Sequence, residues 1–312
     1  MIRIVAGILL IIGIAGGTLI GSKPDVMPTE RGGYKVVEAD FHVHAFSGDG
    51  QLSPFGIVSH ARHKGLHALA ITGHNQIFTG KVGRWFSHLT GGPTVLVGEE
   101  ITAPGFHIIG VGLNERINWN QSAAAVIEEI HRQGGVAIAA HPTQKFWPAL
   151  DEVIDKLDGT EVMHQLAYAP GRRWEEMRDF YQRTEASGRH LTAIGSSDYH
   201  WFNSLGICRT YVFVHNNDEA GILDALRTGR TVVYDREGNA YGNPELIRLL
   251  TERPVESDLE KYDYDYSGLG AFDLISRACG WCGLMLVVLF GQKKRIKNSD
   301  ASHWERGRLA RF

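Results

Sequence analysis

Cysteine is scarce in this sequence. Its 312 residues include three cysteines, Cys208, Cys279 and Cys282. An odd and sparse set argues against a disulfide framework of the kind that stabilises small secreted domains. Cys279 and Cys282 have the spacing of a metal or redox pair, but they lie inside an apolar run. This context favours their interpretation as small residues of a membrane helix.

The chain also lacks a large excess of charge of either sign. Its formal net charge is -3, so bulk attraction to nucleic acid is not indicated. Nucleic acid stays open only as a substrate, because metal ions can supply positive charge locally. A hydrophobic fraction of 43% with 21% charged residues is typical of a folded globular protein and excludes a disordered one.

Two apolar runs stand near the ends of the chain. The first, residues 4–22, has no charged residue, and at about 1.5 Å per helical residue it just spans a hydrocarbon core. We interpret residues 1–23 as an N-terminal membrane anchor, with a cleaved signal peptide as the alternative.

The second apolar run precedes a basic cluster. We predict a second membrane helix over residues 268–292 and a basic tail over residues 293–312. A helix lying on the membrane surface is the alternative. Because basic clusters favour the cytoplasmic side, the predicted topology has membrane lipid as a partner and an extracytoplasmic catalytic domain.

Between these runs, residues 34–235 alternate between predicted strands and helices. Strands are predicted at residues 35–41, 68–72, 94–98, 106–113, 136–140, 191–195 and 211–214. Helices are predicted at residues 54–65, 122–133, 174–187 and 218–227. Short apolar strands separated by amphipathic helices indicate a parallel sheet with helices outside, closed or nearly closed into a barrel. The polar residues 236–267 are interpreted as a linker.

Side chains of metal-binding character lie near the ends of these predicted strands. His42 and His44 end the first strand, where alternation puts both imidazoles on one side. Further histidines and carboxylates lie at other strand ends or in the loops beside them: Asp49, His74, Glu99, Glu100, His107, His141, Asp198 and His200. Loops at the strand ends of a parallel barrel converge on one face. The sequence therefore predicts a metal site, and nitrogen and carboxylate ligands without thiolates suit Zn, Mn or Fe.

The order and spacing of these motifs resemble the PHP (polymerase and histidinol phosphatase) superfamily across residues 34–235. The matching motifs are H-x-H at residues 42–44, G-x-E-[IL]-T at residues 98–102, H-P at residues 141–142 and D-x-H at residues 198–200. Residues 44–50, 72–76 and 205–210 resemble the carbaryl-hydrolase-like metallohydrolase branch.

The resemblance implies a distorted (β/α)7 barrel that binds two or three divalent metal ions. It implies that the first metal is held by His42, His44, Glu100 and Asp198. It implies that Glu100 bridges to a second metal completed by His107 and His141, and that a third is held by Asp49, His74 and His200. Glu99 is then a neighbour of the site or a group behind the ligands.

One position departs from the family pattern. The family's T-D-H motif is Thr72-Gly73-His74 here. A carboxylate that supports a metal site can change metal affinity by about 10- to 100-fold. The absence of this aspartate puts the third metal in doubt, and a two-metal site is the alternative.

Four further residues are candidates for the pocket. His164 lies near where the family places a polar group at a strand end, and we predict it as a catalytic residue, with a structural histidine as the alternative. Lys145, Arg172 and Arg173 lie in loops after family motifs and are predicted to bind a substrate phosphate.

The resulting functional hypothesis is a metal-dependent phosphoesterase that hydrolyses a phosphomonoester or phosphodiester with a metal-bound hydroxide. The alternative is a carbamate or carboxylic ester hydrolase, which a pocket lined by Trp147, Trp174, Trp201 and Phe202 would favour. The second alternative is a catalytically silent membrane-bound sensor or scaffold, for which Gly73 is the one argument.

Overall fold

The structure is a computed structural model that describes residues 2–19, 27–168, 174–200, 204–250, 275 and 278–290. Two compact units divide the chain: residues 1–22 with 265–312, and residues 23–264. The small unit holds α1 (Ile2–Leu19) and a second helix at residues 278–290. These helices approach closely at Gly283, where a Cβ would lie 2.8 Å from the carbonyl oxygen of Ala6. Among the described residues no helix is long and apolar enough to cross a membrane, so the predicted transmembrane helices are not confirmed.

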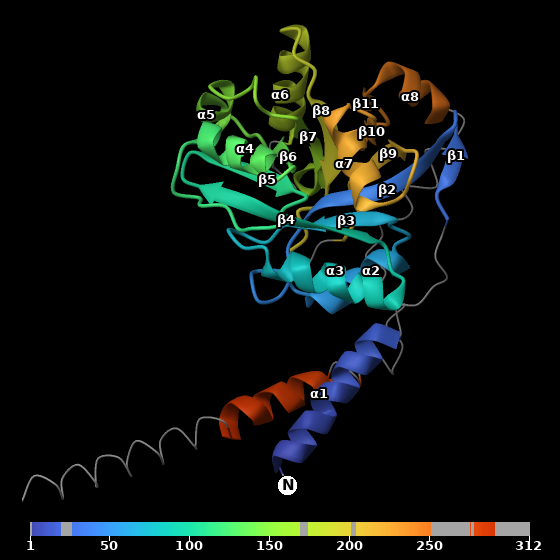
Figure 1. The fold of residues 1–312 in the computed structure, drawn as a ribbon, viewed down its shortest axis with the longest axis vertical. Helices are drawn as coiled ribbons and strands as arrows, with labels where there is room; N and C mark the ends of the chain where they lie inside the picture. Colours follow the sequence, from blue (N-terminus) through green and yellow to red (C-terminus); the bar gives the residue numbers. More distant parts are fainter. Residues whose placement is uncertain are drawn as a thin grey trace, which may run out of the picture. The chain divides into compact units, whose positions relative to one another are not determined.

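The large unit is built on one sheet, which has eleven strands in the described residues (Figure 1). Its strands are β1 (Thr29–Arg31), β2 (Tyr34–Val43), β3 (Ala68–Ile71), β4 (Thr94–Ala103), β5 (Phe106–Val111), β6 (Val136–Ala139), β7 (Gly159–His164), β8 (Thr192–Ser196), β9 (Thr210–Val214), β10 (Thr231–Tyr234) and β11 (Ala240–Gly242). The hydrogen-bonded order is β11-β10-β9-β2-β3-β4-β5-β6-β7-β8, with β1 paired to β2. The prediction of a barrel-like α/β fold is confirmed at this level.

The sheet nearly closes on itself at the end of β2. Val43 and Tyr199 form a parallel bridge. The backbone N–H of His44 donates to the carbonyl oxygen of Tyr199 at 2.9 Å. The segment after β8 therefore lies beside the end of β2, although five strands, β3 to β7, stand between them in the hydrogen-bonded order.

Four strands, β1, β5, β9 and β11, run against the others, which corrects the expectation of a parallel sheet. β5 is antiparallel to both β4 and β6, and β9 is antiparallel to both β2 and β10. Only two residues separate the paired Ala103 and Phe106, whereas a parallel pair needs a crossover of about a dozen residues or more. The start of β5 consequently lies at the same end of the sheet as the ends of β3 and β6.

Helices cover the outside of the sheet. They are α2 (Pro54–His63), α3 (Phe78–Thr90), α4 (Ala123–Arg132), α5 (Trp147–Asp151), α6 (Glu175–Ala186), α7 (Glu219–Arg227) and α8 (Pro244–Leu250). The side chains of Ser53, Ser122 and Asp218 accept hydrogen bonds from the first turns of α2, α4 and α7, which fixes where these helices begin. α4 buries Val126 and Ile130 against the sheet, as its amphipathic pattern predicts.

Part of the predicted linker is folded. β11 pairs with β10, and α8 buries Leu246 and Leu250 in a cluster with Phe213 of β9. Residues 240–250 therefore belong to the large unit. Their strand and helix are too short to give a clear periodic pattern in the sequence.

Candidate metal centre

Four side chains from three parts of the sheet converge at the end of β2. His42 Nε2 lies 3.4 Å from Glu100 Oε2 and 3.2 Å from Asp198 Oδ1. His44 Nε2 lies 3.4 Å and 3.3 Å from the same two oxygens. We call His42, His44, Glu100 and Asp198 the first group. Its members are the four residues that the family resemblance assigned to the first metal.

The chemistry of the first group fits a metal ion. The side chains of His42, His44 and Glu100 are fully buried, and the converging Nε2 atoms and Oε2 make no hydrogen bond within the described chain. A buried polar atom without a hydrogen bond costs about 1–3 kcal/mol. A divalent cation would satisfy all of these atoms at once, because imidazole nitrogen and carboxylate oxygen are its usual ligands.

The other oxygen of Glu100 faces a second group. Glu100 Oε1 lies 2.8 Å from His107 Nδ1 and 3.1 Å from His141 Nε2. Glu100 is a residue of β4 itself, and not of a loop after a shorter strand as the sequence suggested. Antiparallel β5 begins at this end of the sheet, which explains how His107, at the start of a strand, reaches the centre. Glu100 thus has the position expected of a bridging carboxylate.

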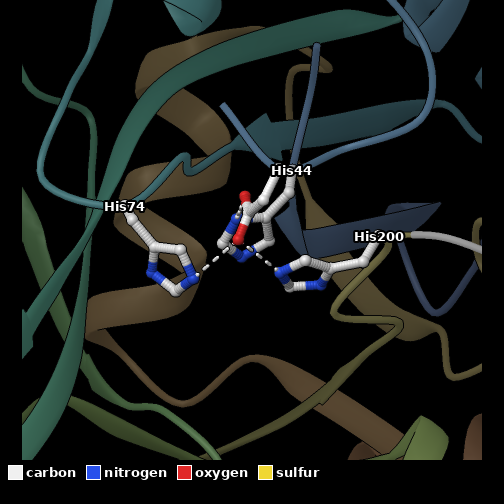
Figure 2. A group of neighbouring side chains, drawn as sticks. His44, His74 and His200 are labelled. Carbon is white, nitrogen blue, oxygen red and sulfur yellow. Dashed lines mark hydrogen bonds and ion pairs between the residues drawn. The ribbon is translucent and has the colours of Figure 1, made fainter. Parts of the chain in front are cut away.

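A third group lies toward solvent. Asp49 Oδ2 is 3.1 Å from both His74 Nε2 and His200 Nε2 (Figure 2). Asp49 Oδ1 is also 3.1 Å from Nδ1 of His44, so the third group is joined to the first. All nine predicted ligands are therefore brought together, although their role as ligands stays a prediction.

Two carboxylates that the sequence analysis did not assign lie behind these groups. Glu161 is fully buried; Oε1 accepts from Nδ1 of His42 at 3.0 Å and Oε2 from the backbone N–H of His141 at 2.5 Å. Asp40 accepts from the backbone N–H groups of Ser197 and Gly206 at 3.0 and 2.9 Å. The available sequence signal for Asp40 was a carboxylate in the predicted strand of residues 35–41, whereas no strand was predicted around Glu161.

His164 contacts a predicted ligand. It is 1% exposed, and its Nδ1 accepts a hydrogen bond from the backbone N–H of Leu166 at 3.2 Å. The neutral ring must then carry its proton on Nε2, which lies 3.2 Å from Asp198 Oδ2. This contact leaves Asp198 Oδ1 directed at the first group. The geometry assigns His164 a positioning role, and its catalytic role stays a prediction.

The charges of the first group stabilise one another. Burial alone would lower the pKa of His42, but the carboxylates of Asp198, Glu161 and Glu100 outweigh it and hold this pKa well above the usual value. Burial would likewise raise the pKa of Glu100, but His42, His107 and His141 hold it well below the usual value. The same carboxylates that favour a proton on His42 would favour a metal cation in its place.

Backbone strain gathers at the same place. Asn75, His141 and Asp198 have positive φ angles of 50°, 27° and 45°. Left-handed backbone at non-glycine residues costs free energy and is concentrated at functional sites. Two of these three residues are predicted ligands, and the third follows one.

The candidate substrate residues are less well placed. Lys145 is exposed, with its ammonium 4.3 Å from the centroid of the Phe146 ring, and that ring lies 4.7 Å from the His107 ring. Trp174 is buried at 4% exposure, and the indole of Trp147 donates to the carbonyl oxygen of Pro142. The remaining candidates lie outside the described residues: Arg172, Arg173, Trp201 and Phe202.

Comparisons with known proteins give one relative and a shared fold. A scan against models of protein families found no match. An uncharacterized protein from Methanocaldococcus jannaschii is 37% identical over 145 residues, covering 41% of this chain and 82% of that protein. This chain belongs to the same family as that archaeal protein.

The solved structures include a two-domain protein from Bacteroides vulgatus, described as containing a predicted PHP-like metal-dependent phosphoesterase. It matches with a TM-score of 0.59 and 23% sequence identity over 74% of each chain. This likeness shows that the two proteins share a fold. The resemblance to the carbaryl-hydrolase-like branch stays a prediction.

Proposed function

We propose that this chain is a metal-dependent hydrolase that acts as a phosphoesterase on a phosphomonoester or phosphodiester. The observation that supports the proposal is the first group, where two imidazole nitrogens and two carboxylate oxygens converge at 3.2–3.4 Å. The fold shared with a protein described as PHP-like and metal-dependent supports the same class of reaction.

Each part of the centre has a distinct task in this proposal. Metal ions bound there would be two or three in number, of Zn, Mn or Fe type, and would lower the pKa of a water molecule towards 7. His42 and His44 would hold an ion through Nε2, and Glu100 would offer one oxygen to each of the first two groups. Glu161 and His164 hold His42 and Asp198 in the orientation that binding requires.

Hydrolysis of a carbamate or carboxylic ester is the second candidate. The observation that favours it is the ring of Phe146, which lies against His107 and His141 of the second group. An aromatic ring beside the metal centre suits an apolar acyl or aryl group better than a phosphate. The ammonium of Lys145, next to this ring, favours phosphate instead.

A substrate panel separates these proposals. The purified full chain is loaded with Mn or Zn and tested on phosphomonoesters, phosphodiesters, carboxylic esters and carbamates. We expect the fastest turnover on a phosphate ester, with loss of activity in His42→Ala and Asp198→Ala. His190→Ala is the matched control, because that imidazole is 80% exposed and pairs with Glu185. Turnover confined to esters or carbamates would favour the second candidate, and no turnover with either metal would refute both.

A further inference from the structure

The backbone at Gly73 leaves room for a neighbouring side chain. A Cβ on Gly73 would collide with Nε2 of Gln76. The Gln76 amide uses this room to cap α3, since Oε1 accepts from the backbone N–H of Thr79 at 3.2 Å and Nε2 donates to the Thr79 hydroxyl at 2.8 Å. The residue at the N-cap position, Ile77, makes no side-chain capping bond. A carboxylate side chain at residue 73, as in the family's T-D-H motif, would not fit beside Gln76 in this position. A hydrogen-bond partner that orients the His74 ring must therefore come from another residue.

That support comes from β4. His74 Nδ1 lies 2.7 Å from the hydroxyl oxygen of Thr102 and is hydrogen-bonded to it. Glu100 Oε2 lies at the same distance from this nitrogen and forms an ion-pair contact with it, without the geometry of a hydrogen bond. When Nδ1 donates its proton to Thr102, the lone pair of His74 is on Nε2, the atom that faces Asp49. The Thr102 hydroxyl directs its own proton to the carbonyl oxygen of Glu100 at 3.5 Å, which leaves Oγ1 free to accept from Nδ1. The Glu100 carboxylate beside Nδ1 favours the same tautomer, the one that the third group needs.

Thr102 is itself held in place by the residue after His74. Asn75 Oδ1 accepts from the backbone N–H of Thr102 at 3.0 Å, and Asn75 Nδ2 donates to its carbonyl oxygen at 3.2 Å. The backbone N–H of Asn75 donates to the carbonyl oxygen of Glu100 at 2.9 Å. Asparagine tolerates the left-handed φ of 50° that this arrangement requires.

We propose that Thr102, clamped by Asn75, is the positioning residue for His74 and sets the metal affinity of the third group. The inference rests on the proposed metal-dependent function. A neutral hydroxyl makes the imidazole a weaker base than a carboxylate partner does. The third group therefore binds its ion more weakly than the first two groups, and its ion exchanges while theirs are retained.

The test compares Thr102→Val, which has nearly the same shape without the hydroxyl, with Thr102→Ser, which keeps it. Mn binding to the metal-free full chain is measured by titration calorimetry. We expect two strong sites and one weaker site in the parent protein. Thr102→Val should weaken the third site by about 10- to 100-fold, whereas Thr102→Ser should stay within about threefold of the parent. Thermal unfolding with chelator present checks that both variants fold.

The outcomes are separable. Equal third-site affinity in Thr102→Val and the parent overturns the inference, as does an equal loss in Thr102→Ser, which would indicate packing. Two sites in the parent would also overturn it while leaving the proposed function intact. No Mn binding to the parent would refute the proposed function as well. Asn75→Gly tolerates the positive φ and removes the clamp, so it tests the same idea if Thr102→Val does not fold.

Discussion

Glu161→Gln is the sharpest perturbation of the first group. The carboxylate accepts from two donors, Nδ1 of His42 and the backbone N–H of His141. A glutamine amide has one acceptor and one donor. The backbone N–H cannot change its role, so the amide oxygen will face it and the NH₂ will face His42. The proton of His42 is then driven onto Nε2, the atom that faces Glu100 and Asp198.

The magnitude follows from this change of tautomer. A metal ion must displace the proton from Nε2 and leave the new amide donor without an acceptor. Loss of such a supporting partner weakens metal binding by about 10- to 100-fold, or about 1.4–2.7 kcal/mol. The assay is competition for Zn between the metal-free protein and a chromophoric chelator at pH 7.5. Activity of the loaded enzyme should fall with the occupancy.

Glu99→Gln is the matched control for this experiment. Glu99 is also fully buried, and its Oε2 accepts from the backbone N–H of Ile117 at 2.9 Å, which a glutamine oxygen can still do. We expect its Zn affinity to stay within about threefold of the parent. If Glu161→Gln binds Zn as tightly as Glu99→Gln does, the tautomer argument is refuted.

Three further predictions concern stability, measured with chelator present. Burial raises the pKa of Glu99 to about 7, so the folded chain holds a proton that the unfolded chain releases near pH 4.5. The free energy of unfolding should therefore fall by up to about 3 kcal/mol as pH rises from about 4.5 to 7. Urea unfolding of Glu99→Gln should lack this loss. Arg209→Met leaves the Glu38 carboxylate buried without its guanidinium and should cost about 3–5 kcal/mol in urea; a loss below 1 kcal/mol would contradict this. Gly73→Asp displaces Gln76 from its cap and should cost about 1 kcal/mol, as should Gly73→Ala; unchanged melting temperatures would show that the cap contributes nothing.

The candidate ligands could be predicted because their positions follow from strand ends. His42 and His44 share one side of β2 through the alternation of side chains, and both end fully buried at the centre. Asp198 follows β8, which the bridge between Val43 and Tyr199 brings beside the end of β2. Ordered motifs therefore carried enough information to place these side chains together.

The supporting residues could not be predicted in the same way. Glu161 lies within β7, a strand that the periodic pattern did not predict, and its partner His42 is 119 residues away. The direction of β5 depends on the two-residue connection after Ala103, which the predicted strand limits of residues 94–98 concealed. These contacts are made across the sheet, and local periodicity reports only which face a residue takes.

The three groups are linked through shared side chains and so cannot be independent. Glu100 offers one oxygen to the first group and the other to the second. His44 faces the first group through Nε2 and Asp49 of the third through Nδ1. The hydrogen bond from Nδ1 of His44 to Asp49 keeps the lone pair of His44 on Nε2, where the first group needs it. An ion bound in the third group would compete with His44 for the Asp49 carboxylate and so weaken this hydrogen bond. Occupancy of the third group should therefore change the affinity of the first, and by linkage the first must change the third by the same factor.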